Sequence, residues 1–180
     1  MAQRASDDIE RAHLRDPHDR TVTIARRLPP AALRAWLRRY WIPVWDVPAG
    51  ERAEQRVLQY PVCLSITTPA YSWFVGPHRG LSTTVLEGRS WGFGTMFAPA
   101  AGAVLHEGPL ADVVDGRCEL ESIPALRGVT AALRALMADG PADAEVHTAC
   151  CALIEERLAR LPAPGEEDLL GIFLVGAYQE

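Results

Sequence analysis

Between residues 41 and 99, glycine and proline interrupt the chain about every ten residues. The interruptions fall at residues 48–50, 68–69, 76–77 and 87–88, so the segments between them are short. Short segments separated by regularly spaced turns are typical of a small antiparallel sandwich or barrel, and not of a fold that alternates strands with helices. The spacing therefore predicts a β-rich body.

The segments between the interruptions alternate in hydrophobicity with a period of two, as strands do. They cover residues 62–67, 71–75, 83–86 and 91–97, and a shorter run at 21–24 suits an edge strand.

The segment 91–97 has large side chains on one face and glycines on the other. Trp91 and Phe93 alternate with Gly92 and Gly94. Glycine inside a strand often marks the close approach of another group, so we expect this strand to pack against a large neighbour.

One segment ahead of the β-rich body has a helical period. Pro29-Pro30 suits the first turn of a helix, and the helix is predicted to end near Pro43. Its apolar positions recur at a spacing of three and four, at Leu33, Trp36, Leu37, Tyr40 and Trp41.

After residue 99 the period becomes helical again, over residues 126–137, 146–161 and 169–177. The last of these segments is apolar nearly all round and reaches Glu180 without a capping residue or a breaker. We therefore expect it to be covered on both sides and the natural chain to continue beyond Glu180.

Together these patterns predict an α+β fold in three parts. Residues 1–19 are a flexible polar tail, residues 20–123 a small antiparallel barrel or sandwich with one inserted helix, and residues 124–180 a helical segment. A chain of 180 residues buries roughly 70% of its unfolded surface, so its core needs no disulfides.

The net charge of −5 argues against nucleic-acid binding by this chain alone, because affinity for nucleic acids comes largely from clustered basic residues. No run of 18 apolar residues occurs, which excludes a membrane-spanning helix, and the polar N-terminus is unlike a secretory signal. The four cysteines lack a C-x-x-C spacing. We expect a cytoplasmic protein with reduced thiols, away from membranes.

No motif for catalysis, a metal or a cofactor stands out. The five histidines contain no His-x-His, the usual mark of a metal-dependent cupin, and no G-x-S-x-G elbow is present. His78 and His106 both fall in the β-rich body. We therefore predict no catalytic residue, no metal and no cofactor.

Aromatic residues are concentrated in the β-rich body. Several of them on one face of a closed sheet would line a cavity, as in small barrels that hold one ligand; the alternative is that they fill the core. With the two histidines of the body added, the predicted ligand-binding residues are Trp45, Tyr71, Trp73, His78, Trp91, Phe93 and His106.

Short motifs in a consistent order resemble a known family. They are residues 27–33 followed by Tyr40-Trp41, the turn at 75–78, the strand end at 94–99 and the segment 110–115. In this order they resemble an uncharacterised N-terminal domain of AraC-type transcription regulators. Ala100 stands where that family usually has glycine, so this turn is expected to differ.

The resemblance implies a cupin-like barrel over residues 20–123 that binds a small-molecule effector, and helices over 124–161 that pair two subunits. It also implies that the region after residue 165 leads to a helix-turn-helix domain absent from this chain, through which alone DNA is bound. Two alternatives remain open: a metal-independent cupin-type enzyme acting on a small organic substrate through His78 or His106, and a pure dimerisation module.

Overall fold

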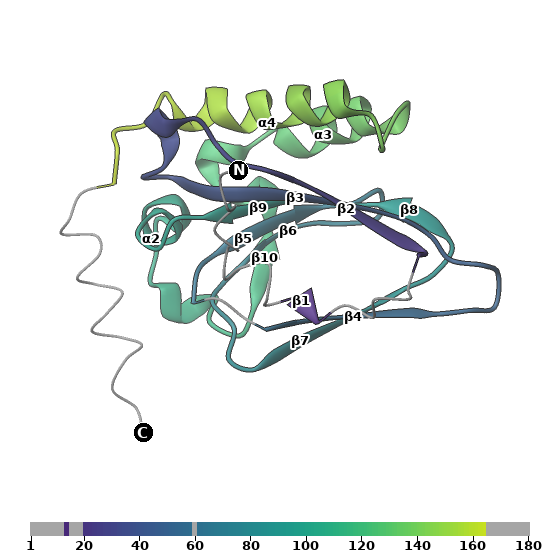
Figure 1. The fold of residues 1–180 in the computed structure, drawn as a ribbon. Helices are drawn as coiled ribbons and strands as arrows, with labels where there is room; N and C mark the ends of the chain where they lie inside the picture. The colour runs from purple at the N-terminus through teal and green to yellow at the C-terminus, as the bar shows by residue number, and fades with distance from the viewer. Residues whose placement is uncertain (1–12, 15–19, 59–60, 165–180) are drawn as a thin grey trace, which may run out of the picture.

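The structure is a computed structural model that describes residues 13–14, 20–58 and 61–164. Two antiparallel sheets and a pair of long helices form its layers (Figure 1). The α+β class and the antiparallel pairing predicted from the sequence are both confirmed. The predicted helix at 169–177 lies outside the described residues.

The larger sheet has seven strands. Its order is β10-β6-β5-β9-β3-β2, and β8 pairs with β3 alongside β9. The strands are β2 (Val22–Arg27), β3 (Leu37–Asp46), β5 (Leu64–Thr67), β6 (Ser72–Val75), β8 (Arg89–Trp91), β9 (Phe93–Phe97) and β10 (Arg117–Glu119).

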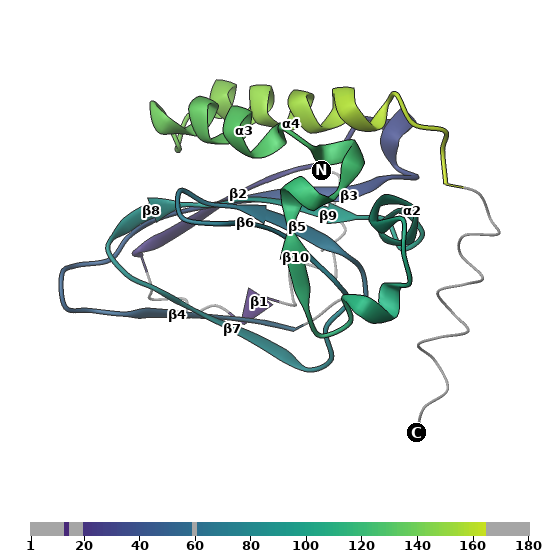
Figure 2. The same cartoon turned by 180° about the vertical axis from the view of Figure 1, so that it is seen from behind.

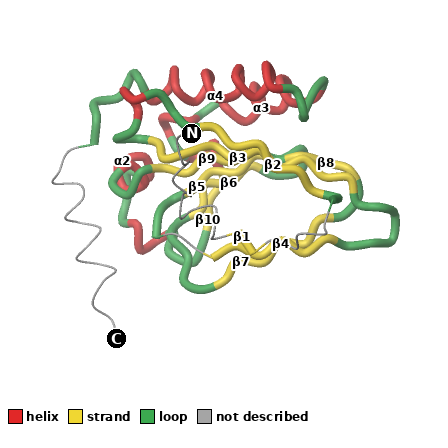
Figure 3. Tube along the Cα trace, viewed as in Figure 1, coloured by secondary structure: helices red, strands yellow, loops and turns green. Residues whose placement is uncertain are grey.

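The smaller sheet has the order β1-β4-β7. Its strands are β1 (His13–Leu14), β4 (Ala53–Leu58) and β7 (Leu81–Leu86). It lies on the side of the seven-stranded sheet away from the long helices (Figures 1 and 3). Among the described strands no ladder joins the two sheets, so the predicted barrel is not closed here.

Two antiparallel helices, α3 (Val129–Ala138) and α4 (Ala144–Leu158), cover the other face of the seven-stranded sheet (Figure 2). We call this the outer face, and the face turned toward the smaller sheet the inner face. One 3-10 turn, η1 (Ala31–Leu33), connects β2 to β3, and a short helix, α2 (Ala101–His106), and η2 (Leu110–Asp112) connect β9 to β10. Two more 3-10 turns, η3 (Leu120–Ser122) and η4 (Pro124–Leu126), connect β10 to α3.

The main hydrophobic core lies between the outer face and the two helices. Its fully buried members include Tyr40, Phe74 and Phe93 from the sheet, and Leu133 and Ile154 from the helices. A second, smaller cluster joins the two sheets at one end, with Trp45 and Val22 packed near Leu86.

The predicted helix over residues 29–43 is wrong. Only η1 is helical there, and β3 follows it. This strand has apolar side chains on both faces, with Tyr40 and Ile42 toward the helices and the half-buried Trp41 and Pro43 on the inner side. A strand that is apolar on both faces lacks strict alternation, so its sequence matches a helical stripe as well as a strand.

The other predicted elements that fall on described residues are present, whereas β4, α2 and β10 were not predicted. All five predicted strand segments are strands, although Gly92 separates β8 from β9 where one strand was predicted. The helices predicted at 126–137 and 146–161 are α3 and α4. In the part of the chain that the structure describes, no helix has the length and apolar character needed to cross a membrane.

Candidate functional site

The inner face of the seven-stranded sheet carries a continuous row of paired residues. The ladders connect Glu119 to Trp73, Trp73 to Ile66, Ile66 to Gly94, Gly94 to Trp41 and Trp41 to Arg26. Directly paired residues project to the same face of a sheet. The row therefore has a charged residue at each end, a tryptophan next to each of these, and Ile66 and Gly94 in the middle.

Trp41 lies flat over Gly94. A Cβ atom on Gly94 would be 2.1 Å from the indole Cε2 and 2.3 Å from Cζ2. The position has to be glycine for the ring to lie there, which confirms the expectation of a large neighbour for this strand. Gly92 is less tightly constrained, because a Cβ there would be 3.1 Å from Ile66 and 3.2 Å from Pro43.

A second aromatic group stands on β6 and the turn before it. The rings of Tyr71 and Trp73 are stacked, with centroids 3.9 Å apart and an interplanar angle of 16°. The guanidinium carbon of Arg117 is 3.7 Å from the centroid of the Trp73 ring. Since Arg117 pairs with Val75, two residues beyond Trp73, it extends the stack along the strand in the direction away from Tyr71.

The turn between β5 and β6 holds Tyr71 in place. The hydroxyl oxygen of Thr68 accepts from the backbone N–H of Ala70 at 3.2 Å and of Tyr71 at 3.0 Å. The backbone N–H of Thr68 donates to the carbonyl oxygen of Tyr71 at 2.8 Å. Burial raises the pKa of the Tyr71 hydroxyl, and the nearby guanidinium of Arg117 offsets part of the rise.

The same turn is bonded to helix α3. Arg134 donates from Nε to the carbonyl oxygen of Thr68 at 2.9 Å. Thr130 donates its hydroxyl to Ser72 Oγ at 3.0 Å, and Ser72 Oγ is 2.8 Å from Thr67 Oγ1. The aromatic stack on the inner face is therefore connected to the helices through the two ends of this turn.

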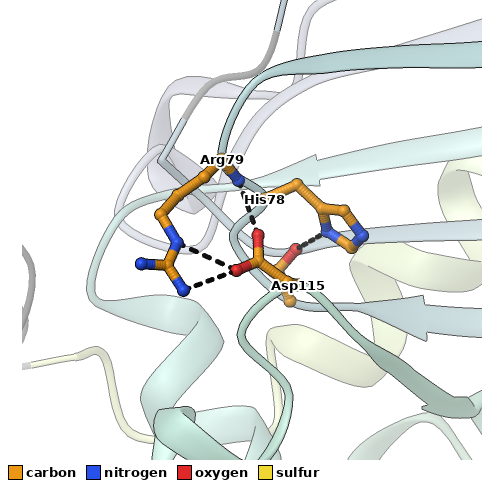
Figure 4. Close-up of polar contacts among 4 residues, drawn as sticks. His78, Arg79 and Asp115 are labelled. Carbon is orange, nitrogen blue, oxygen red and sulfur yellow. Dashed lines mark hydrogen bonds and ion pairs between the residues drawn. The ribbon is translucent and has the colours of Figure 1, made fainter.

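The loop after β6 is pinned to the loop before β10 (Figure 4). Asp115 accepts from the backbone N–H of Arg79 at 2.7 Å and from Arg79 Nε at 2.9 Å. These bonds hold the pKa of the Asp115 carboxyl below its usual value. Gly76 permits the contact, because a Cβ there would be 1.9 Å from the carbonyl oxygen of Val113.

The predicted ligand-binding residues fall into separate places. Tyr71 and Trp73 meet on the inner face. Trp91 and Phe93 belong to the main core under the helices, and Trp45 belongs to the cluster that joins the sheets. The sheet thus divides the predicted aromatic set between its two faces.

The two histidines of the body have different surroundings. Nδ1 of His78 is 3.0 Å from the carbonyl oxygen of Gly76 (Figure 4). His106 stacks on Phe74 at 6.2 Å, and its Nδ1 is buried without a hydrogen-bond partner among the described residues. These contacts do not bring the two rings together. Within the described ranges no cluster of three metal-binding side chains occurs either.

Three of the four thiols are buried and poorly acidic. Burial raises the pKa of Cys63 and of Cys151 to about 12, and that of Cys150 to about 11. All four cysteines are free. A raised pKa leaves almost no thiolate at neutral pH, so these three thiols are held mainly in their protonated form.

The ligand-binding residues predicted from the sequence do not include Ile66 and Arg117. They also do not include Trp41, although its aromatic side chain was apparent from the sequence. Trp41 was assigned to a helix, and Arg117 is brought to Trp73 only by the β10–β6 ladder. The glycines at 92 and 94 were the available signal, because they indicated where a large side chain lies against the strand.

Comparison with protein-family models matches residues 25–119 to a domain of unknown function, DUF6597. The match spans more than half of the chain. The chain belongs to this family. The DUF6597 region runs from β2 to the end of β10 and so contains the whole inner-face row. No curated protein and no solved structure matches the chain.

Proposed function

We propose that this chain is the effector-sensing domain of an AraC-type transcription regulator, with a cupin-like β body whose inner face binds a small molecule. DNA is bound only through a helix-turn-helix domain outside the chain. The single observation that supports binding is the partial exposure of one apolar row on the inner face, opposite side chains that are fully buried on the outer face; the end of the inner face around Trp45 is itself buried.

On the outer face, the large side chains are sealed under the helices: Tyr40 and Phe74 are 0% exposed and Phe93 is 1% exposed. On the inner face, Trp41, Ile66 and Trp73 are only half-buried. Rings that only filled a core would be buried like Phe93. Half-buried aromatic and aliphatic side chains with a few polar neighbours are the usual lining of a small-molecule site.

The contacts of the β5–β6 turn supply a route from ligand to helices. An effector that moved the Tyr71–Trp73 stack would also move Thr68 and Ser72, and with them Arg134 and Thr130 of α3. If the helices have two arrangements, the ligand changes the free-energy difference between them. This change is no larger than the difference between its binding free energies for the two arrangements.

Homodimerisation through residues 124–161 is part of this proposal. The large apolar side chains that the described chain exposes are Leu28, Val57, Leu58, Leu81 and Val85, none of them on α3 or α4. The dimer would therefore use the small side chains on the solvent side of the helices, such as Ala131, Ala135 and Ala152. Sedimentation equilibrium tests this, and a monomer at high concentration would remove it.

Thermal-shift screening against a broad panel of small molecules tests the binding function. We expect at least one compound to raise the melting temperature of the wild type and to have no such effect on Trp73→Leu. Val85→Ala, on the exposed side of the smaller sheet, is the control and should respond like the wild type. A panel without a hit, or a shift that Trp73→Leu retains, would overturn the proposal.

Sequencing the gene beyond the codon for Glu180 tests the regulatory function. Two helix-turn-helix patterns in a basic segment of roughly a hundred residues are expected there, since a DNA-binding domain usually has a basic face. A reading frame with any other kind of domain would contradict the assignment to a regulator.

A further inference from the structure

We propose that the ligand of the inner face is a small planar carboxylate, whose ring lies on the indole of Trp41 and whose carboxylate is bound by Arg117. This inference rests on the proposed function and names the chemical class of its ligand. Three features of the inner face support it.

The first feature is a flat apolar platform. Trp41 covers Gly94, so one face of its indole is taken up by the strand and the other is turned toward the smaller sheet. Ile66 separates it from Trp73 along the row. With strands about 4.8 Å apart, the Cα atoms of Trp41 and Trp73 are roughly 14 Å apart. The Trp41 ring and Ile66 lie within this span, so a ligand ring on Trp41 extends over Ile66 toward Trp73 and Arg117.

The second feature is a guanidinium with its donors still available. The flat side of Arg117 lies on Trp73, which fixes the side chain without using its N–H groups. In the described part of the chain no carboxylate or carbonyl accepts from Arg117. By contrast, Arg79 is paired with Asp115 and Arg52 with Glu87.

The geometry of a guanidinium matches that of a carboxylate, because two parallel N–H groups can donate to its two oxygens. A guanidinium that is already held by a ring loses less conformational freedom on binding than a mobile one. Arg117 is therefore prepared for an oxyanion at the edge of an apolar platform.

The third feature is the sign of the local charge. Leaving aside Arg39, which is buried and has an interaction of its own, the ladders place Arg26 and Arg117 on the inner face against one carboxylate, Glu119. The side chains that the smaller sheet turns toward this face are uncharged: Ala53, Gln55, Val57, Ser82, Thr84 and Leu86. The described inner face is thus positive in a chain whose net charge is −5, which favours an anionic ligand.

Isothermal titration calorimetry with two matched probes tests the inference, namely indole-3-carboxylate and its neutral amide, indole-3-carboxamide. We expect the wild type to bind the carboxylate at least about tenfold more tightly, the ratio expected of a hydrogen bond to a charged group. Arg117→Gln should abolish this preference and retain the amide affinity. Arg56→Gln, which makes the same change on the opposite side of the smaller sheet, should keep the preference.

The outcomes separate the two proposals. If the screening panel yields only neutral ligands and the carboxylate does not bind, the planar-carboxylate inference fails and the sensor function stands. If Arg117→Gln keeps the preference for the carboxylate, Arg117 is not the anion-binding residue and the inference is overturned. If no compound binds at all, both proposals fail.

The circular-dichroism melting curve of Arg117→Gln should match that of the wild type, because Arg117 is exposed on an edge strand.

Discussion

Arg134, on helix α3, donates from Nε to the carbonyl oxygen of Thr68 at 2.9 Å. The turn that begins at Thr68 positions Tyr71, and Tyr71 stacks on Trp73. This hydrogen bond, together with the bond from Thr130 to Ser72, connects the helical layer to the aromatic stack on the far face of the sheet.

Arg134→Met should loosen this connection while keeping the aliphatic part of the side chain. We expect a loss of about 1 kcal/mol of unfolding free energy, since the bond is charge-assisted but only partly buried. Hydrogen exchange at the amides of residues 70 and 71 should become faster. Arg160→Met is the matched control, because its ion pair with Glu156 is exposed and contributes little. Unchanged exchange in Arg134→Met would show that the turn does not depend on the bond from Arg134.

Gly94→Ala tests the contact between Gly94 and Trp41. The new Cβ would fall 2.1 Å from the indole, so the ring has to leave its place on the strand. Overpacking of this kind should lower the unfolding free energy by about 2 kcal/mol or more. The tryptophan fluorescence spectrum should change as well.

Gly116→Ala is the control for this substitution. A Cβ there would be 3.6 Å from its nearest neighbour, an ordinary contact. A chemical-denaturation curve for Gly94→Ala that overlays the curve for Gly116→Ala would mean that Trp41 does not lie on Gly94.

An element of this fold could be predicted from the sequence when the pattern that identifies it lies within a few neighbouring residues. Turn residues and two-residue alternation located the strands from 62 to 97, because both are properties of neighbouring residues. The predicted helix included residues 37–43 of β3, because a strand with apolar side chains on both faces lacks the alternation of a strand that exposes one face to solvent.

The candidate site depends on non-local register, which explains why it was predicted only in part. Tyr71 and Trp73 are close in sequence and were expected to share a face. Trp41, Gly94 and Arg117 come together through three ladders that connect distant segments. A shift of one residue in any ladder would turn a side chain to the other face of the sheet, and no pattern within a single segment fixes that register.

The raised thiol pKa values predict the reactivity of the cysteines. At pH 8, three thiols with pKa values of about 11 to 12 should react slowly with iodoacetamide in the native protein, because little thiolate is present and burial limits access. Cys118, which is only half-buried, should be modified first. Intact-mass measurement over time checks this, with a urea-unfolded sample as the control in which all four react. Rapid modification of Cys63 would contradict the burial of that side chain.

Glu121 caps helix α3 from outside the helix. Its carboxylate accepts from the backbone N–H of Gly128 at 2.7 Å and of Thr130 at 3.2 Å, where Gly128 itself supplies no side chain. Partial burial raises the pKa of this carboxyl, but the hydrogen bonds outweigh it and the pKa lies below the usual 4.5. The stabilising effect is therefore fully present above pH 4.5 and is lost as the pH falls through the lowered value.

Glu121→Gln should accordingly destabilise the protein at pH 7 by about 1 kcal/mol, the usual effect of losing a good cap. The difference in melting temperature from the wild type should shrink as the pH is lowered below 4, because the wild-type carboxyl then becomes protonated and its advantage disappears. Glu119→Gln, an exposed carboxylate two residues earlier, should show no such pH-dependent difference. A Glu121→Gln deficit that stayed constant from pH 7 to the acid limit would mean that the ionised carboxylate is not what caps the helix.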